Sequence, residues 1–283
     1  MTSKRNLCVA KWLVSGALVL VGSSAMADWS FNTSTNVTST TGILSTNSGG
    51  ITATATGLST TGNTGTTFAN ATSITSYAGG GLGVQANTAD VDTPQHSTDN
   101  SGFTDAILLS FNSSVVLTGI KSGWTWKDGA ATGTAAANSD SDVSVLRYIG
   151  TDISATAVAA ATLGKTVKEL TAVGAGWTLV SQLANLVSNA ALPTSTGDTT
   201  LGSSWWLISA YNSDYRSVAT TTSSAANLLD NGNDYFKLLA VAGVATPRGS
   251  VPEPGSLALV GAGLLGFLAS RRKTKGKSFG LAA

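Results

Sequence analysis

The sequence predicts an all-β protein whose ectodomain is a β-sandwich or jelly-roll-like domain. Charged residues make up 11% of the 283-residue chain, against roughly 25% in ordinary soluble proteins. The polar surface must therefore come largely from Thr, Ser, Asn and Gly, which favour strands and turns over helices. Short apolar runs separated by turn-forming residues recur along the middle of the chain, as in sandwiches and barrels.

The predicted strands cover most of the second half of the chain. Turn formers such as Asn112-Ser113 and Asn231-Gly232-Asn233 separate them. The segment 155–170 is the best helix candidate, whereas 178–192 fits either a helix or a strand followed by a loop. The strand candidates are 106–111, 115–126, 142–150, 205–211 and 234–243.

The stretch 33–76 contains 23 Ser or Thr in 44 positions. One interpretation is a low-complexity stalk carrying O-linked glycans. The other is a set of solvated strands, because Thr alternates with apolar residues in segments such as 51–56. We favour strands, and so predict one β-rich, Ser/Thr-rich ectodomain over residues 28–246.

Charge is segregated along the chain, although the net charge is only +1. Basic residues gather at both ends, while residues 28–250 hold eight basic and fourteen acidic side chains, a net charge of −6 (8 − 14). Nucleic acid is excluded as a partner of this middle region, because phosphate binding requires clustered positive charge.

The N-terminal residues 1–27 have the three parts of a secretory signal peptide. A basic opening precedes an apolar run from Trp12 to Val21, which is expected to be helical, and the small residues Ala25 and Ala27 follow. This pattern predicts cleavage after Ala27. The only cysteine, Cys8, lies within this leader, so the exported chain is expected to fold without disulfides.

The C-terminal residues form a second apolar segment with a basic end. Residues 256–270 would make a transmembrane helix of about 22 Å, shorter than the ~30 Å hydrocarbon core of a bilayer. The tail 271–283 is expected to stay cytoplasmic, because Arg271, Arg272 and Lys273 open it with a basic stop cluster. Such a short anchor suggests a processing signal rather than a permanent membrane span.

The linker 247–255 contains Pro252-Glu253-Pro254, whose two prolines hold the chain extended outside the membrane. Together with the apolar run and the basic cluster, this tripeptide resembles the PEP-CTERM sorting signal of bacterial surface proteins. The resemblance implies recognition by an exosortase, transient residence in the inner membrane, and delivery to the cell surface or an exopolysaccharide matrix. Ten residues follow the basic triplet, more than the family usually has.

The middle of the chain resembles a recurring family of exosortase-dependent surface proteins. The matching segments lie within residues 90–243 and include "DSDVSVLRYIG", "WWLISAYN" and "NDYFKLLAVAG". The resemblance implies a surface ectodomain and no catalytic residue.

His96, the only histidine, is the one residue around which a Ser-His-Asp hydrolase could be built. No G-x-S-x-G elbow accompanies it, and a hydrogen-bonded loop histidine is the simpler interpretation. A zinc site would need several His or Cys ligands, which the ectodomain lacks. We therefore expect no enzyme activity, no metal and no cofactor.

Acidic residues gather around His96 and at residues 140–142. Their oxygen ligands would suit Ca²⁺, but the spacing matches no known calcium loop, and Asp and Asn also populate turns for conformational reasons. Both interpretations remain open for Asp90, Asp92, Asp99, Asn100, Asp105, Asp140 and Asp142.

Tryptophans supply a second class of function, because exposed rings stack on sugars. Core packing is the usual role of tryptophan, so only one or two are expected to be available. The candidates are Trp124, Trp126, Trp177, Trp205 and Trp206. The sequence thus favours a structural or adhesive surface protein, with a carbohydrate-binding module of the exopolysaccharide matrix as the alternative.

Overall fold

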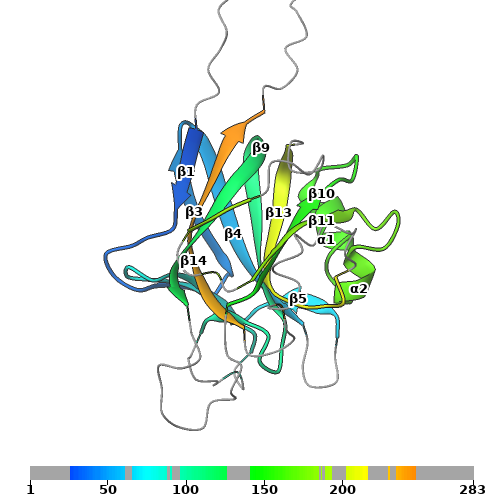
Figure 1. Ribbon diagram of the computed structural model, residues 1–283, viewed down its shortest axis with the longest axis horizontal. Helices are drawn as coiled ribbons and strands as arrows, with labels where there is room; N and C mark the ends of the chain where they lie inside the picture. The colour runs from blue at the N-terminus through cyan, green and yellow to red at the C-terminus, as the bar shows by residue number, and fades with distance from the viewer. Residues whose placement is uncertain are drawn as a thin grey trace, which may run out of the picture.

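A computed structural model describes the ectodomain. The described residues are 26–60, 66–87, 90, 96–125, 141–184, 186, 189–192, 202–215, 229 and 234–246. Most of them lie in antiparallel strands, which confirms the all-β prediction (Figure 1). Within these ranges no helix has the length and apolar character needed to cross a membrane. The predicted sorting helix 256–270 lies outside them.

Fourteen strands join into one hydrogen-bonded sheet, whose main path runs β11-β10-β13-β9-β14-β7-β6-β2. The Ser/Thr-rich segment 33–76 contributes five of the strands, so strands rather than a stalk occupy it. The bounds are β1 Met26–Ser30, β2 Val37–Ser39, β3 Ile43–Ser48, β4 Ile51–Thr60, β5 Phe68–Asn70, β6 Ser73–Tyr77, β7 Gly81–Gln85, β8 Thr98–Asp99, β9 Asp105–Thr125, β10 Val143–Tyr148, β11 Trp177–Leu183, β12 Asn189–Ala191, β13 Ser203–Ala210 and β14 Tyr235–Ala245.

Strand β9 connects the two layers of this sheet. Its first half, 105–111, pairs with β4 and β13, whereas its second half, 115–125, pairs with β14 and β12. The sequence predicted two strands here, separated at Asn112-Ser113. The strand instead continues through that position, because each half finds its own partners and the Asn112 side chain accepts the Thr52 N–H at 3.0 Å.

The main core lies between the two layers, because alternate side chains of strands from both layers point into it. Trp29 of β1 is fully buried there, donates its indole N–H to Ile51 O at 2.8 Å, and meets the Phe111 ring edge-on at 4.9 Å. The inward residues include Ala53, Ile107, Leu109, Val143, Val145, Trp206 and Ile208 from one layer and Ile74, Leu82, Leu117, Phe236 and Val241 from the other.

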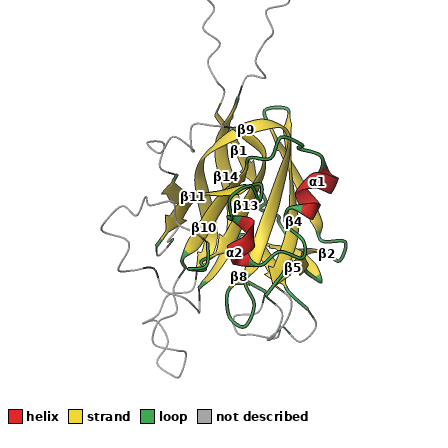
Figure 2. Ribbon diagram, turned by 90° about the vertical axis from the view of Figure 1, so that its right-hand side faces the viewer, coloured by secondary structure: helices red, strands yellow, loops and turns green. Residues whose placement is uncertain are grey.

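A second, smaller core covers the outer face of β10 and β13, under two short helices (Figure 2). The sequence predicted one helix over 155–170. The structure has α1 Ala155–Ala160 and α2 Val167–Leu170. The helix is broken at Gly164, which adopts a left-handed φ of +73° and donates its N–H to Phe68 O. Segment 178–192 resolves into β11 and β12.

The start of β1 and the end of β14 lie side by side at one end of the sheet (Figure 1). Met26 pairs with Val244 and Ala27 with Gly243. Asp28 N–H donates to Ser48 Oγ near the β3–β4 turn. We call this the exit end, because both the predicted leader and the predicted sorting tail join the domain here. The far end holds the starts of β10 and β14.

Candidate functional site

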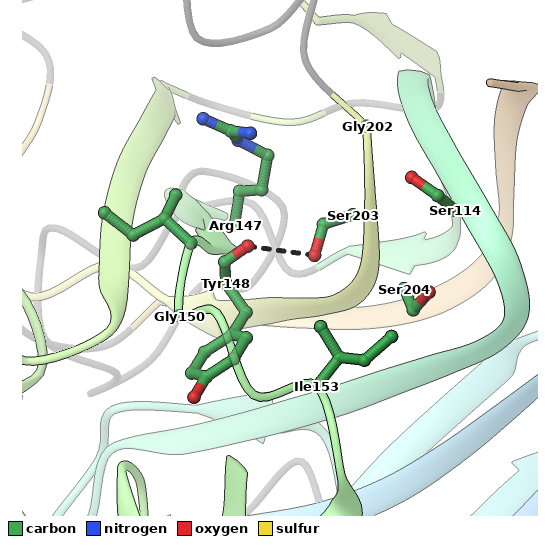
Figure 3. A pocket seen from close by; sticks show the side chains of 9 residues that line it. Ser114, Arg147, Tyr148, Gly150, Ile153, Gly202, Ser203 and Ser204 are labelled. Carbon is green, nitrogen blue, oxygen red and sulfur yellow. Dashed lines mark hydrogen bonds between the residues drawn. The ribbon is translucent and has the colours of Figure 1, made fainter. Parts of the chain in front are cut away.

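A cavity of about 380 Å³ opens at the exit end (Figure 3). It lies where the end of β10, the start of β13 and the bend of β9 meet. Three separate segments supply its wall: Ser114; Arg147, Tyr148, Ile149, Gly150 and Ile153; and Gly202, Ser203 and Ser204.

Arg147 reaches the cavity because of strand alternation. Val143 and Val145 point from β10 into the main core, so Arg147 lies on the same face one step further along. It pairs with Trp206 of β13 and is 5% exposed. Arg147 thus lines the cavity while its side chain is buried at the edge of the apolar core.

Serines line the base of the cavity and the side opposite Arg147. Ser203 Oγ donates to Tyr148 O at 2.9 Å and accepts the Trp205 N–H at 3.1 Å. Ser114 lies across the cavity from Arg147, Ser203 lies between them, and Ser204 lies below Ser114 (Figure 3). The Ser114 carbonyl accepts the N–H of Thr246 at 3.0 Å. The chain therefore passes the cavity wall just before it enters the linker.

An apolar loop forms the outer rim. Ile149 and Ile153 are 52% and 58% exposed, and both line the cavity. The indole N–H of Trp205 donates to Ile153 O at 2.8 Å and so fixes this loop against β13. The cavity thus combines one cation, three hydroxyls and an exposed aliphatic rim.

His96 lies at the opposite end, in a turn before β8. Its backbone has a positive φ of 59°, unusual for a residue other than Gly. Its carbonyl packs against Gly83, where any side chain would collide with it. The buried Nδ1 has no hydrogen-bond partner among the described residues. The structure therefore places His96 in a tightly packed turn at the far end.

Acidic residues near His96 are buried and hydrogen-bonded. Asp99 accepts from Ser97 Oγ and from the Ser101 N–H, and Asp90 accepts the Ala86 N–H. Asp92 and Asp140 lie outside the described residues. Across the described part of the chain, no three His, Cys, Asp or Glu side chains are grouped to hold a metal ion. Asp90 and Asp99 thus act as acceptors for neighbouring backbone and hydroxyl donors.

Asn100 and Asp142 join a network centred on Asp234, a residue that the sequence analysis did not single out. Asn100 donates through Nδ2 to the Asp234 carboxylate and to Tyr211 O, and its Oδ1 accepts the Asp234 N–H. Asp234 Oδ1 also accepts the Asp142 N–H at 2.9 Å. The network ties the starts of β10 and β14 to the loop after β8.

The tryptophans divide between core and surface. Trp177 and Trp206 are buried, Trp124 and Trp205 are half-buried, and Trp126 lies outside the described residues. The Lys237 ammonium lies 4.7 Å from the Trp124 ring centroid and 4.0 Å from that of Tyr77. Burial lowers the pKa of Lys237. Tyr77, Trp124 and Lys237 form a cation–π cluster rather than a flat row of open rings.

Sequence reasoning missed Arg147. The clue was present, because a lone arginine interrupts the apolar run "VSVLRYIG", and charged residues are rarely buried without a role. Its partners in the cavity could not be assigned, since Ser114 and Ser203 belong to segments far away in the sequence.

The predicted processing residues lie at the exit end or beyond the described chain. Ala27 is 8% exposed within β1, and Ala25 lies outside the described residues. The sorting residues Pro252, Glu253 and Pro254 and the stop cluster Arg271, Arg272 and Lys273 also lie outside them. The structure therefore locates where the two processing segments attach to the domain.

Comparison with known proteins gives one result for the chain. Residues 250–273 match the family model of the PEP-CTERM protein-sorting motif. No curated protein and no solved structure shows significant similarity to the chain. The motif covers the tripeptide, the apolar run and the basic cluster together, and it implies a secreted protein whose sorting depends on an exosortase. The chain therefore carries a PEP-CTERM protein-sorting signal at residues 250–273.

Proposed function

We propose that this protein is a structural or adhesive component of the bacterial cell surface or extracellular matrix, associated with exopolysaccharide. The observation that carries the proposal is the sorting motif at residues 250–273, directly after the last strand of the ectodomain. Two sheet layers around one apolar core support the finer description of the ectodomain as a β-sandwich. Such a domain buries its apolar side chains and presents Ser, Thr and Asn outside.

The proposed role is not enzymatic. His96 supports this view, because its Nδ1 is buried and its carbonyl is packed against Gly83 at the far end. A general base needs a ring nitrogen within hydrogen-bond reach of its nucleophile. The neighbouring Ser97 hydroxyl instead donates to Asp99 at 2.7 Å.

The proposed maturation has two cuts. Signal peptidase removes residues 1–27, and the segment 256–270 then holds the precursor in the inner membrane with residues 271–283 in the cytoplasm. The exosortase removes this tail at the Pro252-Glu253-Pro254 linker. The marginal length of the anchor favours a temporary hold over a permanent one.

Replacing Pro252, Glu253 and Pro254 together by Ala tests the proposal, because the apolar run and the basic cluster remain. The variant should still be exported, but it should accumulate in the membrane with its full tail. Mass spectrometry of the wild-type protein recovered from the cell surface should find no peptide from residues 256–270. The matched control, Pro247→Ala, removes a proline from the same linker outside the tripeptide and should be processed normally.

Two results would contradict the proposal. Retention of "SLALVGAGLLGFLAS" by the wild-type surface protein would make the tail a plain anchor. Maturation of the triple-alanine variant as efficient as that of the wild type would show that the tripeptide does not direct the cut. Deletion of residues 271–277 supplies a further check, since loss of the basic stop should let the segment slip through the membrane and reduce processing.

A further inference from the structure

We propose that the outer edge of β3 pairs with the same edge of a second copy of this chain, giving an antiparallel, two-fold dimer in which the sheet continues from one copy into the other. The inference rests on the proposed function, because it names the partner through which an exported structural protein associates.

Strand β3 forms an edge of the sheet. It pairs with β4 along its whole length without a bulge, and it has no other strand partner in the described part of the chain. At other edges, β2 and β12 have three residues each, β11 meets β10 with a bulge, and β1 carries Asp28. The six residues of β3 include no charge and no proline, so β3 lacks the features that usually prevent an edge from pairing.

The hydrogen-bonding pattern shows which backbone groups of β3 point away from β4. The Gly57 N–H donates to Gly42 O at 3.2 Å, so the backbone of Gly42 is directed toward β4. Inward and outward bonding groups alternate along an antiparallel strand. The N–H and C=O groups of Ile43, Ser45 and Asn47 are therefore directed outward, where they form a template for an added strand.

Side chains, rather than another strand, contact the two ends of this edge. The Ile43 N–H donates to Ser39 Oγ at 3.1 Å, which confirms that it points away from β4. At the exit end, the Asp28 N–H donates to Ser48 Oγ at 3.3 Å. Between these contacts, alternate side chains from Ile43 to Asn47 are exposed. The middle of the edge is thus the part that a partner strand reaches.

The distribution of charge favours a second copy as the partner. No charged side chain occurs from Trp29 to Ala89, the stretch that forms β2 to β7. The ectodomain as a whole has a net negative charge, so two copies repel each other through the rest of their surfaces. They approach most closely where neither carries a charge, and the edge of β3 lies in that region.

One register uses every outward group of the edge. With Ser45 opposite the partner's Ser45, Ile43 lies opposite the partner's Asn47, and the same pair repeats on the other side of the two-fold axis. Ile43, which is 51% exposed, becomes covered by its cross-strand neighbour. Because the same patch is used on both copies, the contact closes as a dimer.

The antiparallel arrangement also links pairing to release from the membrane. Strand β3 runs toward the exit end, where Ser48 contacts β1. A two-fold pair turns the two exit ends in opposite directions, whereas precursors anchored in one membrane all direct this end toward the bilayer. Domains therefore pair after the tail has been removed.

Disulfide trapping tests the register, because the ectodomain has no cysteine of its own. Ser45→Cys, in the protein recovered from the cell surface, should form an interchain disulfide when oxidised with diamide. The paired Cα atoms would lie about 5.5 Å apart, within the range of a disulfide. Asn47→Cys is the matched control on the same edge. Its two copies would be at least about 13 Å apart, so it should stay largely uncrosslinked.

Sedimentation equilibrium of the cysteine-free surface protein measures the pairing itself. Wild type should change from monomer to dimer as its concentration rises. Ser45→Lys places two like charges opposite each other and should raise the dissociation constant at least about tenfold. Thr40→Lys adds the same charge in the exposed turn before β3 and should match wild type. Both variants should keep the circular dichroism spectrum of the wild type, since both side chains are exposed.

Several results would overturn the inference: a monomeric wild type at every soluble concentration, equal trapping of Ser45→Cys and Asn47→Cys, or undiminished pairing of Ser45→Lys, which would place the contact on another surface. Trapping of Ser45→Cys in the anchored triple-alanine variant would contradict the antiparallel arrangement. If the tail is removed normally and the copies do not pair, only this inference fails. A wild-type tail that is never removed would count against the proposed function instead.

Discussion

Asp105 begins β9 with a carboxyl group that is 1% exposed. Burial raises its pKa well above the ordinary 3.8, the nearby charges of Asp99 and Asp90 raise the pKa further, and a hydrogen bond from Ser59 opposes them. The folded state therefore binds this proton more tightly than the unfolded chain. Its contribution to stability is greatest below the ordinary Asp pKa and declines as the pH rises through the raised value.

The variant Asp105→Asn should remove that decline, since an amide fills the same space without titrating. We expect a higher melting temperature than wild type at about pH 8 and a smaller difference at about pH 4. Asp152→Asn is the matched control, because folding lowers the pKa of Asp152 whereas it raises the pKa of Asp105. Asp152 is exposed, and a hydrogen bond from the Ser154 N–H lowers its pKa, so the amide should give no gain at about pH 8. A melting temperature of Asp105→Asn below that of wild type at about pH 8 would contradict this expectation, because it would mean that the charged carboxylate stabilises the folded state.

At the scale of elements, α2 depends on its cap, because four residues alone do not form a stable helix. Glu169 N–H donates to Thr166 Oγ1, and Glu169 Oε2 accepts the Thr166 N–H at 2.8 Å. Hydrogen bonds from Thr166 lower the pKa of Glu169. The ionised Glu169 carboxylate therefore stabilises the folded state above the ordinary Glu pKa, and this stabilisation is lost as the pH falls through the lowered pKa.

Thr166→Ala should therefore destabilise the domain by about 1 kcal/mol at neutral pH, the usual loss for an N-cap. Its melting temperature should fall by about 2–4 °C, and the difference from wild type should shrink at low pH. Thr156→Ala, in the exposed part of α1, is the control and should cost nothing, since Ala favours helix. An unchanged melting temperature for Thr166→Ala would mean that burial of Val167 and Leu170 alone holds α2.

The elements also show what sequence reasoning can reach. The alternation in β4 and the apolar runs of β10, β13 and β14 predicted strands correctly, because each run buries one or both faces in a core. The continuity of β9 was missed, since its two halves are held by different distant partners. The cavity was also missed, because it is formed where three separate segments meet.

For the whole molecule, the pairing of β1 with β14 sets which end of the domain would face the membrane in the proposed anchored precursor. Thr246 and Pro252 are separated by only five residues, and this link spans at most about 20 Å. While the tail is anchored, the exit end with its cavity must lie close to the bilayer. The far end, with the Asp234 network and the β6–β7 turn, faces away from it.

Single cysteines in the triple-alanine variant of Pro252, Glu253 and Pro254 test this orientation. The ectodomain has no cysteine of its own, so each label reports one position. Asn47 is exposed near the β3–β4 turn at the exit end, and Ala78 is exposed in the β6–β7 turn at the far end. On spheroplasts, a bulky maleimide should label Asn47→Cys several-fold more slowly than it does after the membrane is dissolved in detergent, because the bilayer shields that end. Ala78→Cys should react at the same rate in both conditions. Equal slowing at both positions would mean that the domain lies on its side, and slowing at Ala78 alone would reverse the orientation inferred from β1 and β14.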